Sequence, residues 1–226
     1  MKSFFAVFSG CFFLPLRRPV GLTLCLAAAV LLTASSHAQF GPPDPGTKVL
    51  DAGALTPPVG ARVAIIEFLD LQCPDCAKAN PMVKDAVAKY KIPWLRHDFT
   101  LPFHSWSRLA AIDARWFDLT SPDLGNEYRD RVFAEQPTIK DVDGLRLFTE
   151  KFAREHGLTL PQEVDPDGKL ATLVKTDYAL GQRIGVEHTP TIWVVTAGSK
   201  GAPFVEVVDH DKLFEMIEQA LKQTAR

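Results

Sequence analysis

The stretch ARVAIIEFLDLQCPDC, residues 61–76, decides the fold of this chain. Its first ten residues form a short apolar run of the length of a buried β-strand. Two cysteines, Cys73 and Cys76, then stand where this run gives way to apolar side chains at helical spacing. The sequence therefore predicts a strand over 61–70 and a helix that opens at Cys73 and has helical spacing over 77–90, with a kink at Pro81.

The segment Cys73-Pro74-Asp75-Cys76 is a Cys-x-x-Cys motif at the predicted start of a helix. Unpaired backbone N–H groups and the helix dipole stabilise a thiolate at this position, which lowers the pKa of the first cysteine. The second cysteine lies one turn further along, where it can resolve a mixed disulfide. A bond across two intervening residues removes little entropy from the unfolded chain, so the pair is of little use as a structural staple.

Redox chemistry is one use of such a pair, and metal binding is another. A Zn or Cu(I) site would need ligands beyond the two thiols, and His104 and His188 are the candidates. A third possibility is a peptide-binding module in which the disulfide is incidental. All three stay open at the level of the motif alone.

Two positions outside the motif favour redox chemistry. Glu67 lies six residues before Cys73 in a strand that is otherwise apolar. Burial raises the pKa of a carboxyl group, so Glu67 could exchange a proton with a nearby thiol; the alternative is a glutamate that reaches solvent. Thr189-Pro190 precedes a later strand, where a proline indicates a cis bond or an ordinary strand start. A cis bond would expose the backbone of Thr189 to an extended peptide.

The remaining pattern predicts an α/β fold, with a mixed sheet covered by helices and an inserted helical domain over about 105–184. The expected strands are 92–99, 191–195 and 204–208, the last two forming a hairpin. Helical spacing is found over 105–117, 124–135, 143–156, 170–184 and 211–222. Asp143 is expected to cap the helix that it begins.

The first 38 residues have the pattern of a secretory signal peptide. Basic residues without any acidic residue precede an apolar run over 20–32, and small residues lead to Ala38. We predict cleavage after Ala38 and export to the periplasm, with an uncleaved membrane anchor as the alternative. Residues 39–60, rich in proline and glycine, are predicted to be an extended lead-in with one edge strand near 48–51. Residues 61–226 form the expected folded domain.

Composition excludes several classes of protein. The 25 Lys and Arg residues balance 27 Asp and Glu residues, for a net charge of −2, so the chain lacks the basic surface that nucleic-acid binding needs. Hydrophobic residues make up 46 % and charged residues 23 %, which excludes a disordered or multi-span membrane protein. No nucleic-acid partner is therefore expected.

The sequence resembles the thioredoxin superfamily, and specifically its DsbA-like thiol:disulfide oxidoreductases. The resemblance spans about Ala61 to the C-terminus and rests on 67–76, Pro81, 99–104 and 185–191. It implies that Cys73 is the nucleophile, Cys76 the resolving cysteine, Glu67 the buried acid and Pro190 the cis-proline. The long interval between Cys73 and Pro190 is similar to that of DsbA, in which a helical domain is inserted.

The resemblance also implies a function. It predicts an exported monomer that exchanges disulfides with unfolded or thiol-bearing proteins, as an oxidase rather than a reductase, without a cofactor or a bound metal. A quinone-linked membrane partner similar to DsbB or VKOR would reoxidise the pair, or a reductant would supply it with electrons. Thr189 and Pro190 are expected to bind substrate, and Pro74, Asp75 and His188 to tune the redox potential.

This chain departs from the family pattern at three of these positions. Asp75 stands where the strong oxidant of the family has His, and His188 where many relatives have a small residue. Thr189 before the proline is more similar to the disulfide isomerases. These departures concern the redox direction more than the fold.

Overall fold

The computed structural model of the protein describes residues 48–198 and 204–225. Every described residue belongs to one compact unit, Ala38–Arg226. The predicted signal peptide and most of the predicted lead-in thus lie outside the described residues. Within the described ranges, no helix has the length and apolar character needed to cross a membrane.

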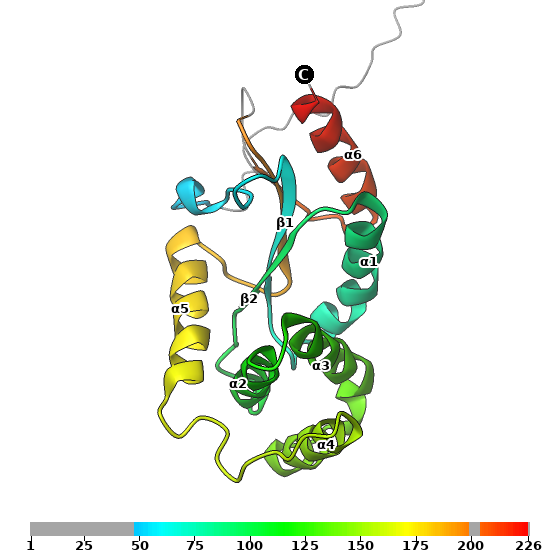
Figure 1. The fold of residues 1–226 in the computed structure, drawn as a ribbon. Helices are drawn as coiled ribbons and strands as arrows, with labels where there is room; N and C mark the ends of the chain where they lie inside the picture. Colours follow the sequence, from blue (N-terminus) through cyan, green and yellow to red (C-terminus); the bar gives the residue numbers. More distant parts are fainter. Residues whose placement is uncertain (1–47, 199–203, 226) are drawn as a thin grey trace, which may run out of the picture. The chain divides into compact units, whose positions relative to one another are not determined.

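A mixed four-stranded sheet lies at the centre of the fold, in the order β2-β1-β3-β4 (Figure 1). The central strand β1 runs parallel to β2 and antiparallel to β3, and β4 is antiparallel to β3. The strands are β1 (Val63–Leu69), β2 (Trp94–Asp98), β3 (Thr191–Thr196) and β4 (Phe204–Glu206). Every residue of β1 is buried, which explains why the strand is apolar except for Glu67. The predicted fold class is confirmed.

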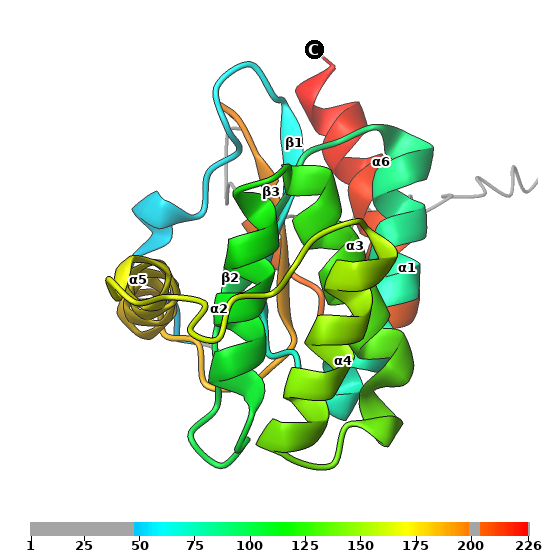
Figure 2. The ribbon, with the colours of Figure 1, turned by 60° about the horizontal axis from the view of Figure 1, so that its bottom comes forward.

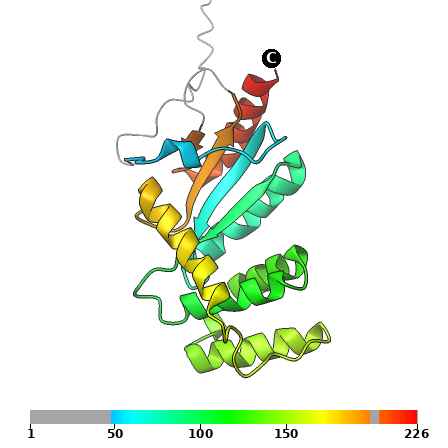
Figure 3. The same ribbon diagram turned by 60° about the vertical axis from the view of Figure 1, so that its left-hand side comes forward.

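Helices cover both faces of the sheet. Helices α1 (Pro74–Tyr90) and α6 (Leu213–Thr224) lie on one face, and α5 (Lys169–Ile184) lies on the other (Figure 3). Successive side chains of a strand point to opposite faces, so β1 contributes to both layers. Val63 and Ile65 pack with α1 and α6, whereas Ile66 and Phe68 belong to the cluster that includes Ile184 of α5.

Three further helices, which we call the helical insertion, pack together at one end of the sheet (Figure 2). They are α2 (Ser107–Asp118), α3 (Pro122–Glu135) and α4 (Val142–Glu155). Their common core contains Phe117, Tyr128 and Phe152, and the same cluster includes Cys73 and Cys76. The two cysteines therefore lie at the junction between the sheet and the helical insertion.

The structure corrects several details of the sequence-based prediction. The edge strand expected near 48–51 is wrong: the Leu50 N–H donates to the Ile184 carbonyl at the end of α5, and Ala52–Ala54 form a 3-10 turn. The segment is held there because Leu55 is fully buried among residues of the α5 face. The helix expected to open at Cys73 begins at Pro74, with Cys73 as its N-cap, and it continues through Pro81.

The cap of α4 is also placed differently. Asp141, not Asp143, caps this helix, because the Asp141 side chain accepts a hydrogen bond from the Gly144 N–H three residues later. Asp143 lies in the first helical turn, where its negative charge interacts favourably with the positive end of the helix dipole.

Candidate active site

Cys73 and Cys76 are held at the point where the central strand leads into α1. Cys73 is the N-cap residue of α1, with extended backbone angles, and Pro74 takes the first helical position. Proline suits that position because it has no N–H to leave unpaired. Cys76 follows in the first turn and is completely buried, whereas Cys73 retains 6 % of its surface. Both residues are free cysteines in this structure.

The surroundings of Cys73 favour its thiolate. The pKa of the Cys73 thiol is lowered to about 6, chiefly by a hydrogen bond from the Cys76 thiol, against the opposing effect of burial. The side chain of Thr189 and the backbone N–H groups of Cys76 and Asp75 lower this pKa further. The two backbone N–H groups are the donors that a helix start supplies. Cys73 is therefore mostly ionised at neutral pH, as the motif predicts.

Cys76 has the opposite environment. Burial raises the pKa of the Cys76 thiol far above its ordinary value, and the neighbouring Cys73 and Glu67 raise it further. The Asp70 N–H, which lies 3.5 Å from the Cys76 sulfur, opposes this effect only in part. Cys76 therefore keeps its proton until a base removes it.

Glu67 is the nearest candidate for that base. Its side chain lies within β1 and is almost completely buried, so the alternative of a glutamate that reaches solvent is wrong. Burial raises the pKa of Glu67 to about 7, although Arg96 and a hydrogen bond from Trp94 both lower it. The Trp94 Nε1 donates to Glu67 Oε2 at 2.8 Å. A carboxyl group with this pKa can both accept and release a proton near neutral pH.

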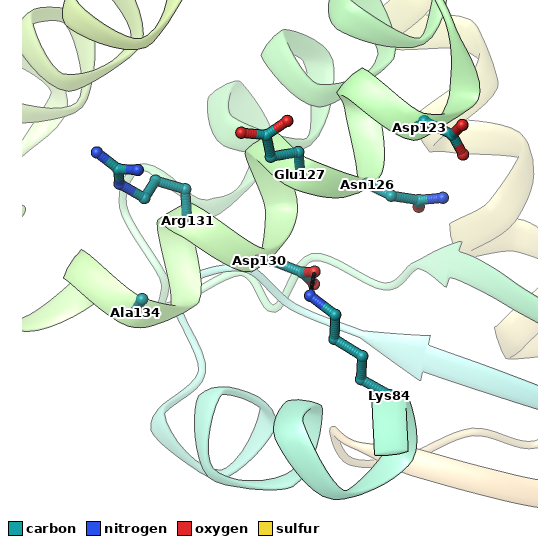
Figure 4. Close-up of a pocket in the computed structure, with 7 residues that line it drawn as sticks. All are labelled: Lys84, Asp123, Asn126, Glu127, Asp130, Arg131 and Ala134. Atoms are coloured by element: carbon teal, nitrogen blue, oxygen red, sulfur yellow. Dashed lines mark hydrogen bonds and ion pairs between the residues drawn. The ribbon is translucent and has the colours of Figure 1, made fainter. Parts of the chain in front are cut away.

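A charged network continues from Glu67 into the helical insertion. Arg96 of β2 pairs with Glu67 in the strand register, and its guanidinium lies 3.5 Å from the centre of the Trp94 ring. The same guanidinium donates to Asp130 of α3 at 3.0 Å. Asp130 also accepts from Lys84 at 2.6 Å, on the wall of a cavity of about 400 Å³ (Figure 4). The insertion thus contributes a charge to the environment of the buried acid.

This network predicts that Arg96 controls the proton affinity of Glu67. Arg96→Met should raise the pKa of Glu67 by about one unit or more, because the variant removes the opposite charge nearest to a buried carboxylate. Carboxyl ¹³C NMR of Glu67 across pH 4–10 measures the shift. Lys84→Met is the matched control, since Lys84 contacts Asp130 from the solvent side. Equal titration curves for both variants would show that Arg96 does not act on Glu67.

The loop before Cys73 is tied to the segment after β2. The carboxylate of Asp70 is buried and accepts hydrogen bonds from the backbone of Gln72 and of Leu101, each at 2.7 Å. His104 Nδ1 lies 2.9 Å from the same carboxylate. His104 therefore contacts the loop that leads to Cys73 through the Asp70 carboxylate. Among the described residues, no group of three or more His, Cys, Asp and Glu is arranged to hold a metal ion.

Two glutamines join this loop to the helical insertion. Gln72 Oε1 accepts from the backbone N–H groups of Trp106 and Ser107, which are unpaired at the start of α2. In the reverse direction, Gln136, at the end of α3, donates through Nε2 to the Leu71 carbonyl at 2.9 Å and to the Cys73 carbonyl at 3.1 Å. The backbone of the nucleophile is therefore held by the insertion.

The segment before β3 faces Cys73 from the other side. The Thr189–Pro190 bond is cis, and the Thr189 carbonyl accepts a hydrogen bond from the Cys73 thiol at 3.3 Å. The Thr189 hydroxyl is buried and has no partner among the described residues, which leaves it free to donate to an ionised Cys73. His188 is exposed, with Nε2 3.9 Å from Glu206 of β4. Thr189 therefore lies beside Cys73, and the cis bond that the sequence suggested before Pro190 is present.

Sequence reasoning missed the supporting residues Arg96, Asp130, Gln72 and Gln136. One signal was available for Arg96, because a basic residue in a strand beside a buried acid points to an ion pair. No signal identified Gln136, since a polar residue at a helix end is common and its partner is 63 residues away. The register of the strands and the packing of the insertion are needed to find them.

Comparison with known proteins agrees with this geometry. The family model for thioredoxin matches residues 59–203, more than half of the chain. Disulfide bond formation protein D of Bacillus subtilis is 28 % identical over 175 residues, which cover 72 % of this chain and 74 % of that protein.

Solved structures show the same fold. The structure of oxidised BdbD from B. subtilis superposes with a TM-score of 0.56 at 23 % identity, over 78 % of this chain and 97 % of that one. The thiol-disulfide exchange protein alpha-DsbA2 from Wolbachia pipientis has a TM-score of 0.56 at 16 % identity, over 73 % and 84 % of the two chains.

Proposed function

Because the chain belongs to the thioredoxin family, we propose that it is a DsbA-like thiol:disulfide oxidoreductase that exchanges disulfides with protein thiols. One observation carries this proposal: a cysteine with a pKa of about 6 stands beside a buried cysteine that keeps its proton. The first can attack or leave as a thiolate, and the second can close or open the disulfide. Glu67, with a pKa of about 7, gives a proton to Cys76 when the disulfide opens and takes it back when the disulfide closes.

Substrate oxidation begins from the Cys73–Cys76 disulfide. A substrate thiolate attacks the Cys73 sulfur, the bond to Cys76 breaks, and the Cys76 thiolate takes a proton from Glu67. A second substrate thiolate then attacks the substrate sulfur of the mixed disulfide and displaces Cys73 as a thiolate. Two substrate thiols have become one disulfide, and the cysteine pair has gained two electrons and one proton at Cys76.

The low pKa of Cys73 favours the direction of oxidation. Stabilising the thiolate stabilises the reduced protein, and this makes its disulfide a stronger oxidant. In the opposite direction, the Cys73 thiolate attacks a substrate disulfide and Cys76 releases the reduced product. The redox potential decides between these two uses.

The setting of the reaction is part of the same proposal. Residues 1–38 are a signal peptide, and the exported domain over 61–226 meets its thiol-bearing substrates in the periplasm as a monomer. A quinone-linked membrane protein reoxidises the pair. The similarity to a disulfide bond formation protein and to a thiol-disulfide exchange protein supports this proposal.

Equilibration with glutathione tests the proposed function and its direction. We expect a reduction potential between about −270 mV, the value for thioredoxin, and about −120 mV, the value for DsbA. Asp75 places a negative charge beside the Cys73 thiolate, so Asp75→His should make the protein more oxidising by tens of millivolts. The fraction of reduced protein is read from trapped thiols over a series of glutathione buffers.

Two results would count against the proposal. A cysteine pair that does not equilibrate with glutathione would rule out an oxidoreductase. A potential that stays fixed in Asp75→His, or moves toward that of thioredoxin, would show that Asp75 does not set the potential. Asp143→His is the matched control, since Asp143 is an exposed first-turn aspartate on another helix.

A further inference from the structure

A groove lies beside the active site, next to the Thr189 and Pro190 segment. Its volume is about 430 Å³, and its walls come from the start of α1, from the segment before β3 and from the residues after β4. Thr189, whose carbonyl is bonded to the Cys73 thiol, is one of the lining residues. A substrate whose sulfur reaches Cys73 therefore has its neighbouring residues close to this groove.

Two exposed carboxylates from different elements line the groove. Asp75 comes from the first turn of α1, and Asp211 comes from the 3-10 turn His210–Lys212. Both side chains are exposed, and neither carboxylate has a hydrogen-bond or ion-pair partner among the described residues. A third lining carboxylate, Asp209, is partly neutralised by Lys212 at 3.6 Å. Two acidic groups thus face the groove without a cation of their own.

A fourth carboxylate lies behind the wall. Glu206 is 6 % exposed, and its Oε2 has no hydrogen-bond partner among the described residues. Its other oxygen lies 3.9 Å from Nε2 of His188, which lines the groove. Glu206 does not itself line the groove, so it adds acidic character behind His188 rather than a contact to the ligand.

The opposing positive charge is smaller. Lys78 of α1 is the only lysine or arginine among the described lining residues. His188 and His210 also line the groove. Counted over the three aspartates and the one lysine of the lining, the formal charge is −2.

The groove also offers an apolar surface. Val207 and Val208 also line the groove, and Val208 is 70 % exposed. Lysine and arginine side chains combine an apolar stem with a cationic head, and they bury the stem while the head stays with polar groups. Exposed valine next to unpaired carboxylates matches both parts of such a side chain.

We propose that this groove accepts a lysine or arginine side chain of the substrate, within a few residues of the cysteine that reacts with Cys73. The stem lies on Val207 and Val208, and the head lies between Asp75 and Asp211. Cysteines in basic segments are then the preferred substrates. This inference rests on the proposed function and names its substrate class.

Two dicysteine peptides test the inference. They differ only in two residues that flank one cysteine, Lys in one peptide and Glu in the other. The oxidised protein reacts with each at pH 8, and each rate is divided by the rate of the same peptide with bis(2-hydroxyethyl) disulfide, an uncharged reagent. This division removes the effect of the flanking charge on the peptide's own thiol. We expect the normalised Lys/Glu ratio to be about five, and to fall toward one in 1 M NaCl.

Variants assign the preference to the groove. Asp211→Asn should reduce the ratio about twofold or more, and Asp211→Lys should reverse it. Asp143→Asn, an exposed aspartate of α4, is the matched control and should leave the ratio unchanged. Thermal unfolding of each variant confirms that it is folded.

The outcomes separate this inference from the proposed function. A wild-type ratio of one, a preference for the Glu peptide, or equal ratios for Asp211→Asn and Asp143→Asn would overturn the basic-substrate inference alone. Failure to oxidise either peptide, while bis(2-hydroxyethyl) disulfide reacts with both, would overturn the proposed function instead.

Discussion

Iodoacetamide at pH 7 is expected to modify Cys73 and to leave Cys76 unmodified in the folded, reduced protein. With a pKa of about 6, roughly nine-tenths of Cys73 is thiolate at this pH, whereas Cys76 is fully buried and its pKa is strongly raised. We expect rates that differ by about 1,000-fold or more. The rate at Cys73 should fall as the pH drops through about 6, because the thiolate is then protonated.

Mass spectrometry measures this selectivity. Both cysteines lie in one tryptic peptide, between Arg62 and Lys78, so fragmentation of that peptide is needed to place the label. The same reaction in guanidinium chloride is the control, and there the two thiols should react at similar rates. Comparable labelling of Cys76 in the folded protein would contradict the assignment of Cys73 as the nucleophile.

Glu67→Gln is expected to slow the resolution of the mixed disulfide by about 100-fold at pH 8. Cys76 must lose its proton to attack, and Glu67 is the buried base beside it; a positioned base contributes about 10²–10⁴-fold. The variant also removes a negative charge that raises the pKa of Cys76, which offsets part of the loss. In the wild type the rate should rise through about pH 7 as Glu67 ionises, and this step should be absent in the variant.

A single-turnover experiment follows this step. Reduced protein is mixed with oxidised glutathione, and the mixed disulfide at Cys73 is quenched and quantified over time from pH 5 to pH 9. Glu163→Gln, an exposed glutamate outside any helix or strand, is the matched control. If both variants follow the wild-type profile at every pH, Glu67 does not transfer the proton.

The order of strands and helices was predictable because each element has a clear period. The buried strand at 63–69 is apolar except for Glu67, and the helices of the insertion repeat their apolar residues at helical spacing. The cysteine motif lies between the predicted strand and the predicted helix, so the sequence could place Cys73 at the start of α1. The essential geometry of Cys73 therefore followed from local pattern.

The network around Glu67 could not be predicted in the same way. Arg96 and Asp130 lie on β2 and α3, and they meet Glu67 only through the strand register and the packing of the insertion. The prediction of an edge strand in the lead-in was wrong for a related reason. Its short extended segment near 48–51 has the composition of an edge strand, but its backbone bonds to the end of α5. Contacts between distant segments decide both cases.

Gln72 and Gln136 have a consequence for protein engineering. Replacing the insertion by a short connection would leave the carbonyls of Leu71 and Cys73 without the Gln136 amide and would uncover the apolar side of both cysteines. The insertion is therefore not a detachable module grafted onto a finished catalyst. A chimera that exchanges it between relatives must carry both halves of these contacts, the loop glutamine and the glutamine after α3, as one transplanted unit.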